Sequence, residues 1–264
     1  MVRNDHKLIL VAIAMCIIVP IVVYLGLQAY LSKEFFSTVL YADGTLIIEE
    51  SSLDKKGNEE KHGEIVKEYP SFEEDGYIFD RDQHKPYWYK DAQLITSIEV
   101  GSEIQPENLA FWFSDLYYVN TINVSKIDAS QVESMAYLFN EIGYYADELT
   151  IKGIDSWDTS NVTDMQYMFR AAGANAKKFE LKGGLDDWDT SKVRITVYMF
   201  CDAGKQADEC DIGDLSNWDT SSVIAATAMF ANFSENDHSN DHFRELQQKF
   251  VNAAIQNATD EGIN

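Results

Sequence analysis

The chain contains few of the residues that most often mark a catalytic or nucleic-acid-binding site. Its 264 residues include 21 basic residues against 44 acidic ones, 5 histidines and 3 cysteines, and the net charge is −23 at pH 7. A negative field of this size disfavours nucleic acid and anionic lipid surfaces as partners. The sequence has no phosphate-binding loop, nucleophile elbow, dinucleotide fingerprint or calcium-binding loop. We therefore expect a protein that is not an enzyme and that has no cofactor, no metal and no nucleic-acid partner.

The histidines and cysteines that are present form no recognisable motif. Only His238 and His242 have the i, i+4 spacing of a zinc-binding helix, but the glutamate of an H-E-x-x-H motif is missing, so a solvated helix start is the favoured interpretation. Cys210 is expected to be a small core residue, and Cys201 is expected at an exposed helix end. Their spacing does not decide whether they form a disulfide.

A long apolar stretch precedes the rest of the chain. Residues 8–31 carry no charged side chain, and at about 1.5 Å per residue a helix of this length would span about 36 Å, enough to cross a hydrocarbon core of about 30 Å. Arg3 and Lys7 flank its start, which predicts a cytoplasmic tail at residues 1–7. A cleaved signal peptide is the alternative, but the stretch is long and lacks a clean small-x-small cleavage site. We therefore expect a single-pass membrane anchor, with residues 33–264 extracytoplasmic at the cell surface.

The most informative feature is a motif that repeats about every 30 residues. Trp-Asp-Thr-Ser occurs at residues 157–160, 188–191 and 218–221, and a weaker copy, Ile-Asp-Ala-Ser, occurs at 127–130. A phenylalanine closes each copy, and these phenylalanines are Phe139, Phe169, Phe200 and Phe230. Repeats of this length predict a solenoid, in which each unit buries its apolar residues against its neighbours.

Within a repeat, the pattern predicts a helix, a glycine stop, a loop and a short strand. Asp158 is a good helix N-cap, and Trp157 and Val162 have the spacing of a hydrophobic staple. The apolar residues from Val162 to Phe169 fall on one face of a helix. Gly173 would end that helix in the left-handed conformation. The tryptophans, methionines and phenylalanines are therefore interpreted as core residues, and the aspartates as caps rather than metal ligands.

Alternating apolar residues predict one short strand per repeat. The residues expected to face the core are Leu149, Ile151, Phe179, Leu181, Cys210 and Ile212. Because side chains alternate along a strand, their neighbours should face outward in rows about 4.8 Å apart. These outward residues, our candidate partner-binding face, are Thr150, Lys152, Glu180, Lys182 and Asp211. A merely solvated face is the alternative, in which case the loops at residues 144–145 or 87–89 would carry the function.

Other segments flank the repeats. Residues 33–93 are expected to form a small β-rich region, with a hairpin at Asp43-Gly44 and a strand at residues 87–89. The solenoid is expected at 94–233, with an entry cap and about four repeats. Residues 234–264 should contain a terminal capping helix, because apolar residues from Phe243 to Ala254 recur with helical spacing.

The repeats resemble a known family. The W-D-T-S-x-V-x-x-M-x-x-M-F pattern of residues 157–169 is similar to that of the BspA-like leucine-rich-repeat surface proteins of bacteria. Residues 40–46 resemble the hairpin that often precedes such repeats, and residues 103–113 resemble their entry cap. The resemblance covers about residues 39–233. It implies an α/β fold, a short leucine-rich-repeat-like solenoid with a parallel strand ladder and helices on the other side, and a role in adhesion or protein binding.

This chain departs from the family pattern in three respects. Its repeats are few, its last two repeats lack the Thr-Asp-Met of residues 163–165, and no C-terminal wall-sorting motif is present. The family supplies no shared catalytic residues. We expect a membrane-anchored surface protein that binds another protein or a host or matrix ligand. Two alternatives remain. Polymer formation would favour a pilin-like or structural subunit. A pocket with converging ionisable groups would favour an enzyme whose site is invisible in the sequence.

Overall fold

The computed structural model describes residues 35–50, 55–73, 79–80, 85–234 and 241–263. The apolar stretch at residues 8–31 and the histidine at position 238 lie outside these ranges. Among the described residues, no helix is both long enough and apolar enough to span a membrane.

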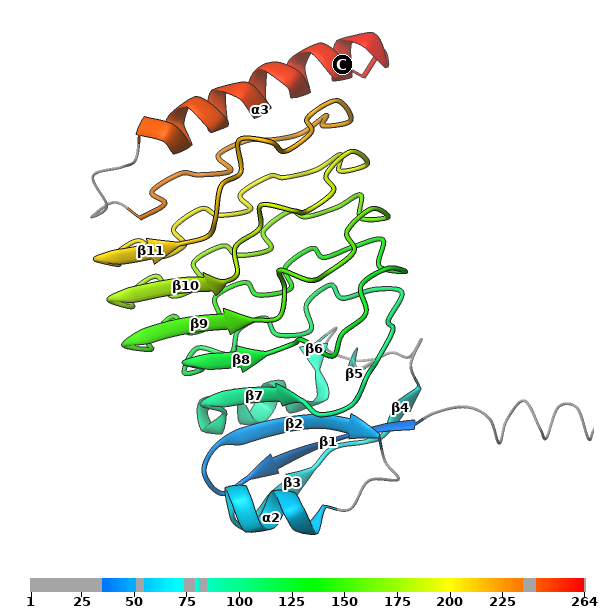
Figure 1. Cartoon of the computed structure of the whole chain (residues 1–264), viewed down its shortest axis with the longest axis vertical. Coiled ribbons are helices and arrows are strands. Elements are labelled where there is room, and N and C mark those ends of the chain that lie inside the picture. The colour runs from blue at the N-terminus through cyan, green and yellow to red at the C-terminus, as the bar shows by residue number, and fades with distance from the viewer. Residues whose placement is uncertain (1–34, 51–54, 74–78, 81–84, 235–240, 264) are drawn as a thin grey trace, which may run out of the picture.

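One mixed sheet runs the length of the molecule along one side (Figure 1). Its order is β11-β10-β9-β8-β7-β2-β1-β3, with β4 paired to β1. The strands are β1 (Phe35–Tyr41), β2 (Thr45–Glu50), β3 (Ile65–Glu68), β4 (Phe72–Glu73), β7 (Ser97–Val100), β8 (Thr121–Asn123), β9 (Glu148–Lys152), β10 (Lys178–Lys182) and β11 (Glu209–Asp211). The pairs β2–β7, β7–β8, β8–β9, β9–β10 and β10–β11 are parallel. Strand β1 is antiparallel to its neighbours β2, β3 and β4. Strands β5 (Phe79–Asp80) and β6 (Lys85–Pro86) pair separately. The predicted parallel ladder is confirmed.

The predicted N-terminal hairpin is confirmed and continues the same sheet. The Asp43-Gly44 turn joins β1 to β2, and the Asp43 carboxylate accepts a hydrogen bond from the N–H of Thr45 at 2.9 Å. Gly44 has a φ of +86°, and a Cβ there would lie 2.5 Å from the Thr96 hydroxyl oxygen, so the turn requires glycine. Because β2 pairs in parallel with β7, the hairpin closes one end of the repeat ladder.

The strand predicted at residues 87–89 is wrong. This segment begins the 3-10 helix η1 (Tyr87–Leu94), which follows Pro86. Trp88 and Ala92, four residues apart, are both buried, which is a helical spacing. The three adjacent aromatic residues at 87–89 suggested a strand and gave no sign of this spacing. Trp88 is 1% exposed and belongs to the main core. The short helix α2 (Lys56–His62) lies beside the hairpin (Figure 1).

The helix predicted in each repeat is also wrong, because a run of consecutive β-turns takes its place. The N–H of Leu138 bonds to the carbonyl of Met135, three residues earlier, whereas an α-helix would use the fourth. The N–H of Tyr137 instead bonds to the carbonyl of Gln166 in the next repeat, at 3.0 Å. Tyr137 has a φ of 60°, which is left-handed and incompatible with an α-helix. Half of the backbone donors in this run are therefore satisfied by the neighbouring repeat.

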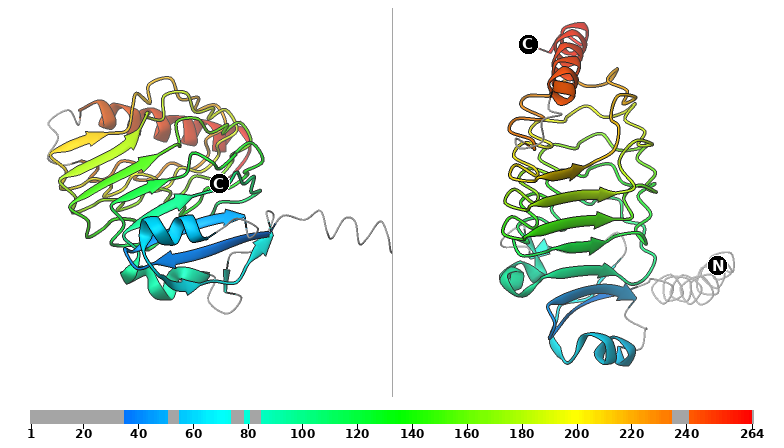
Figure 2. Two further views of the ribbon diagram at one scale, coloured as in Figure 1. Left: turned by 60° about the horizontal axis from the view of Figure 1, so that its bottom comes forward. Right: turned by 60° about the vertical axis from the view of Figure 1, so that its left-hand side comes forward.

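The same turns recur in register along the solenoid. Parallel bridges connect Asn108, Ser134, Asp164, Ile195 and Ala225 in successive units. The solenoid therefore has two backbone ladders, the strand ladder on one side and the turn ladder on the other (Figures 1 and 2). Apolar spacings of three and four residues fit successive turns as well as a helix, which is why the periodicity was misleading.

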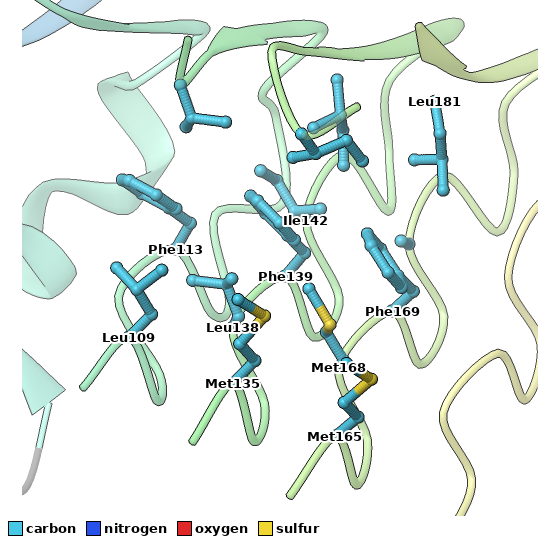
Figure 3. Close-up of a cluster of buried hydrophobic side chains, with 14 of the residues drawn as sticks. Leu109, Phe113, Met135, Leu138, Phe139, Ile142, Met165, Met168, Phe169 and Leu181 are labelled. Carbon is cyan, nitrogen blue, oxygen red and sulfur yellow. The ribbon is translucent and has the colours of Figure 1, made fainter. Parts of the chain in front are cut away.

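The core between the two ladders is built from stacked aromatic side chains. Rings of neighbouring repeats stack with centroids 5.2–5.7 Å apart, in the series Phe113, Phe139, Phe169, Phe200 and Phe230. Figure 3 shows the first three of these rings above the leucines and methionines of the turn ladder. All five are at most 8% exposed, which confirms the predicted core.

The Trp-Asp motif is structural, but the aspartates do not cap helices. Asp158 accepts a hydrogen bond from the N–H of Ser160 at 3.0 Å, which forms an Asx turn, and the other three copies do the same. Trp157, Trp188 and Trp218 stack at 6.2–6.3 Å and are at most 5% exposed. The predicted left-handed glycine is confirmed at Gly143, Gly173 and Gly204, where it closes turns rather than a helix.

The predicted C-terminal cap is confirmed. Helix α3 (Asp241–Asp260) crosses the last repeat, at the end opposite the hairpin (Figures 1 and 2). Its Phe250 packs edge-on against Trp218, with ring centroids 6.3 Å apart. The Gln247 side chain accepts a hydrogen bond from the N–H of Phe230 and donates one to the carbonyl of Ala226. Helix α3 thus covers the turn run of the last repeat and satisfies some of its backbone groups, in the place that a further repeat would otherwise occupy.

Candidate binding surface

Three parallel strands bring the five predicted outward residues onto one face. Thr150 of β9, Glu180 of β10 and Asp211 of β11 are aligned in one row, and Lys152 and Lys182 are aligned in the next. The alternate residues of β9 and β10 are fully buried, so the predicted alternation holds. We call the set Thr150, Lys152, Glu180, Lys182 and Asp211 the outer strand face; Figure 2 (right) looks onto these strands.

Ion pairs organise the centre of this face. The Glu180 carboxylate lies 3.0 Å from Nζ of Lys182 and 3.3 Å from Nζ of Lys178. The hydrogen bond from Lys182 lowers the pKa of Glu180, so the carboxylate is charged at neutral pH. The Asp211 carboxylate accepts a hydrogen bond from the N–H of Gly213 at 3.2 Å. Lys182 is largely exposed and Lys178 is partly exposed, and pairs with an exposed partner add little stability, so a lysine can exchange Glu180 for an acidic group of a partner at small cost.

A cluster of tyrosines adjoins this face, and the sequence revealed only half of it. Tyr145 lies against Tyr117, Tyr118 and Tyr144, with ring centroids 4.9–6.1 Å apart. We call these four residues the tyrosine cluster. The loop at residues 144–145 was one predicted alternative site, whereas residues 117–118 were not singled out. The signal that could have found them is the repetition of a Tyr-Tyr pair in successive units.

A groove beside the tyrosine cluster contains ionisable side chains that are paired with one another. It has a volume of about 440 Å³ and includes Glu141, Arg170, Asp202 and Lys205 in its lining. Arg170 donates to the Glu141 carboxylate at 2.6 Å, and Lys205 donates to Asp202 at 2.9 Å. Burial opposes ionisation of Asp202, but hydrogen bonds from Asn232 and Lys205 keep its pKa below the usual value. Burial raises the pKa of Tyr117 to about 12. At neutral pH, Asp202 is therefore ionised and Tyr117 is protonated.

Cys201 and Cys210, which both lie in the described part of the chain, form no disulfide. Cys201 was expected at an exposed helix end, but its side chain points into the molecule and is 7% exposed. The missing helix explains the difference, because Cys201 belongs to the turn run. Burial raises the pKa of its thiol to about 11, with a further contribution from Asp202. Cys210 is half-buried and packs against the core, close to the predicted role.

Searches of curated proteins and of solved structures found no match to this chain. Residues 107–243 match the family model described as "Mycoplasma protein of unknown function, DUF285". The match extends from the first turn run to the start of α3 and covers just over half of the 264 residues. The chain therefore belongs to the DUF285 family.

Proposed function

We propose that this chain is a membrane-anchored surface protein that binds another protein through its outer strand face. The observation that carries the proposal is the alignment of hydrogen-bonding and charged side chains, three of them exposed and two half-buried, in rows on three parallel strands. A rigid parallel ladder holds such groups at fixed spacing, so a partner can meet several of them with little loss of conformational freedom.

Two features of the sequence support the cellular setting of this proposal. The uncharged stretch at residues 8–31 suits a membrane anchor, with residues 33–264 outside the cytoplasm. The resemblance to BspA-like surface proteins suggests adhesion to a host or matrix protein. The exposed Lys152 and Lys182 provide basic contacts on a chain whose net charge is −23, so an acidic segment of a partner fits this face better than it fits most of the surface.

Charge reversal on the outer strand face tests the proposal. The variant carries Glu180→Lys, Lys182→Glu and Asp211→Lys, which inverts the 180–182 ion pair without removing it. The full-length chain is displayed on cells and exposed to biotinylated surface and matrix proteins. We expect the wild-type chain to retain a protein that the reversed variant loses. Circular dichroism of both chains should show the same fold, because all three side chains point away from the core.

A matched control changes three exposed charged residues elsewhere. The variant with Glu133→Lys, Asp187→Lys and Lys192→Glu alters the net charge by the same amount and should bind like the wild type. If both variants lose the partner equally, net charge rather than the outer strand face determines binding. If neither loses it, the proposed face is wrong. A structural subunit would instead form polymers from the chain alone, and that observation would replace the binding proposal.

A further inference from the structure

Two exposed large apolar side chains in the described part of the chain form a single patch. Tyr145 is 60% exposed and Tyr118 is 44% exposed, and their ring centroids lie 5.6 Å apart. Tyr145 is also flanked by Tyr144, in an edge-on contact at 4.9 Å, and by Tyr117 at 6.1 Å. A ring supported on several sides by other rings loses little rotamer freedom when a ligand covers it. Exposed aromatic side chains gathered in this way mark a binding site more often than a solvated surface.

Tyr145 stands between two grooves. One is the groove of about 440 Å³ that contains the Arg170–Glu141 pair. The other has a volume of about 550 Å³ and is lined by Tyr118 and Tyr145 together with polar residues of β8, β9 and the segments that precede them. An elongated ligand that lies across Tyr145 would therefore contact both grooves.

The second groove offers hydrogen-bonding groups and is acidic. Its polar lining includes Asn120, Asp147, Glu148 and Thr150. The side chains of Asn120 and Asp147 are exposed and form no hydrogen bond within the described part of the chain, so they are available to a ligand. The lining of this groove includes two carboxylates and no basic side chain, and Lys178, which is aligned with Glu148, pairs instead with Glu180 at 3.3 Å. Uncompensated carboxylates disfavour an anionic ligand, whereas the hydroxyl groups of a neutral ligand can donate hydrogen bonds to them.

A neutral oligosaccharide has the chemistry that these groups require. One face of a sugar ring presents C–H bonds, which carry partial positive charge and pack on the electron-rich face of a tyrosine. Its edge presents hydroxyl groups, which donate to carboxylates and accept from amides. We propose that the patch formed by Tyr118 and Tyr145, with Asn120 and Asp147 beside it, is a binding site for a neutral oligosaccharide. The proposal goes beyond protein binding by the outer strand face and does not depend on it.

An oligosaccharide array tests this proposal on the full-length chain. The chain is purified in a detergent without a sugar headgroup, because alkyl glycosides would compete for the site. The array contains neutral, sialylated and sulfated oligosaccharides, and each hit is titrated by calorimetry. We expect neutral oligosaccharides to bind, and the Tyr118→Ala, Tyr145→Ala double variant to lose at least about ten-fold in affinity. Tyr145→Phe keeps the ring and should lose less. Leu94→Ala removes a side chain that is 48% exposed on η1 and should bind like the wild type.

Several outcomes would overturn the assignment. Binding of sialylated or sulfated oligosaccharides alone would point to a basic surface, and absence of any bound oligosaccharide would remove the proposed ligand. Undiminished binding by the double tyrosine variant would place the sugar elsewhere. If an arginine-rich peptide, included as a separate probe, binds at this patch while sugars do not, the carboxylates rather than the rings determine the ligand. The reversed variant of the outer strand face should keep its sugar binding, which separates failure of this proposal from failure of the protein-binding proposal.

Discussion

Replacing Trp188 with alanine should destabilise the solenoid strongly. The indole is 4% exposed and lies between two parallel rings, Trp157 at 6.3 Å and Trp218 at 6.2 Å. Its Nε1 donates a hydrogen bond to the carbonyl of Ile154 in the preceding repeat, at 2.8 Å. The substitution therefore removes packing between three repeats and one hydrogen bond between two of them.

The magnitude follows from these contacts. Truncating a buried tryptophan to alanine typically costs about 3–5 kcal/mol of unfolding free energy. The lost hydrogen bond adds about 0.5–1.5 kcal/mol, and no more, because the Ile154 carbonyl also accepts from the N–H of Trp157 at 3.3 Å and is not left unsatisfied. A total of about 4–6 kcal/mol should lower the melting temperature by roughly 10 °C or more for a domain of this size.

Thermal unfolding followed by circular dichroism measures this effect. Trp188→Phe is the matched control, since it keeps an aromatic ring in the stack but removes the N–H donor, and it should cost clearly less than the alanine variant. A melting temperature for Trp188→Ala within about 2 °C of the wild type, a shift worth only about 1 kcal/mol for a domain of this size, would refute the reasoning. It would mean that the indole is exposed in solution and does not join the repeats.

Other substitutions test separate parts of the structure. Gly204 has a φ of +52°, and a Cβ there would lie 2.9 Å from Phe179, so Gly204→Ala should lower the free energy of unfolding by about 1–3 kcal/mol. At Gly57 in α2 a Cβ would meet no described atom within 4 Å, so Gly57→Ala should raise it by about 0.5–1 kcal/mol. Urea unfolding measures both changes. Burial raises the pKa of Glu49, so the contribution of this side chain to stability is lost as pH rises from the unfolded-state value of about 4.3 through the raised folded-state value. Glu49→Gln should therefore raise the melting temperature at neutral pH and not below about pH 4; an equal shift at both would contradict this. The thiol of Cys201, with its pKa raised to about 11, should resist alkylation until the protein unfolds, which mass spectrometry would show.

The solenoid could be predicted because its signals are periodic. Phe139, Phe169 and Phe200 occupy equivalent core positions, and their spacing gives the repeat length directly. The strands were predictable for a related reason, because the alternation around Leu149 and Phe179 records which side chains are buried. Both patterns reflect burial, and burial is what an amino-acid sequence records most faithfully.

The turn ladder was not predictable from the same signals. A helix and a run of β-turns bury side chains at similar spacing and differ mainly in where the backbone hydrogen bonds go. The N–H of Phe139 bonds to the carbonyl of Met168, a partner 29 residues later, and such long-range pairing leaves no local pattern. Left-handed residues such as Tyr137 and Tyr167 also run against local preference, since a φ near 60° is unusual for tyrosine. Their rings stack at 4.6 Å along the ladder, which offsets part of that cost.

The two candidate sites differ in the same way. The outer strand face follows from alternation alone, so the amino-acid sequence suffices to place Glu180 and Lys182 on it. The tyrosine cluster combines residues from two loops, and Tyr118 meets Tyr145 only because successive repeats stack in one particular register. Local sequence patterns predict which residues are exposed, but not which exposed residues from different repeats become neighbours.

Hydrogen–deuterium exchange of the full-length chain, with and without its captured protein partner, tests the binding account most directly. Binding at the outer strand face should slow exchange in β9, β10 and β11, which carry this face, and leave exchange unchanged in the turn ladder at residues 160–172. Protection confined to the turn ladder, to the N-terminal hairpin or to α3 would contradict the account and assign partner binding to a different side of the solenoid.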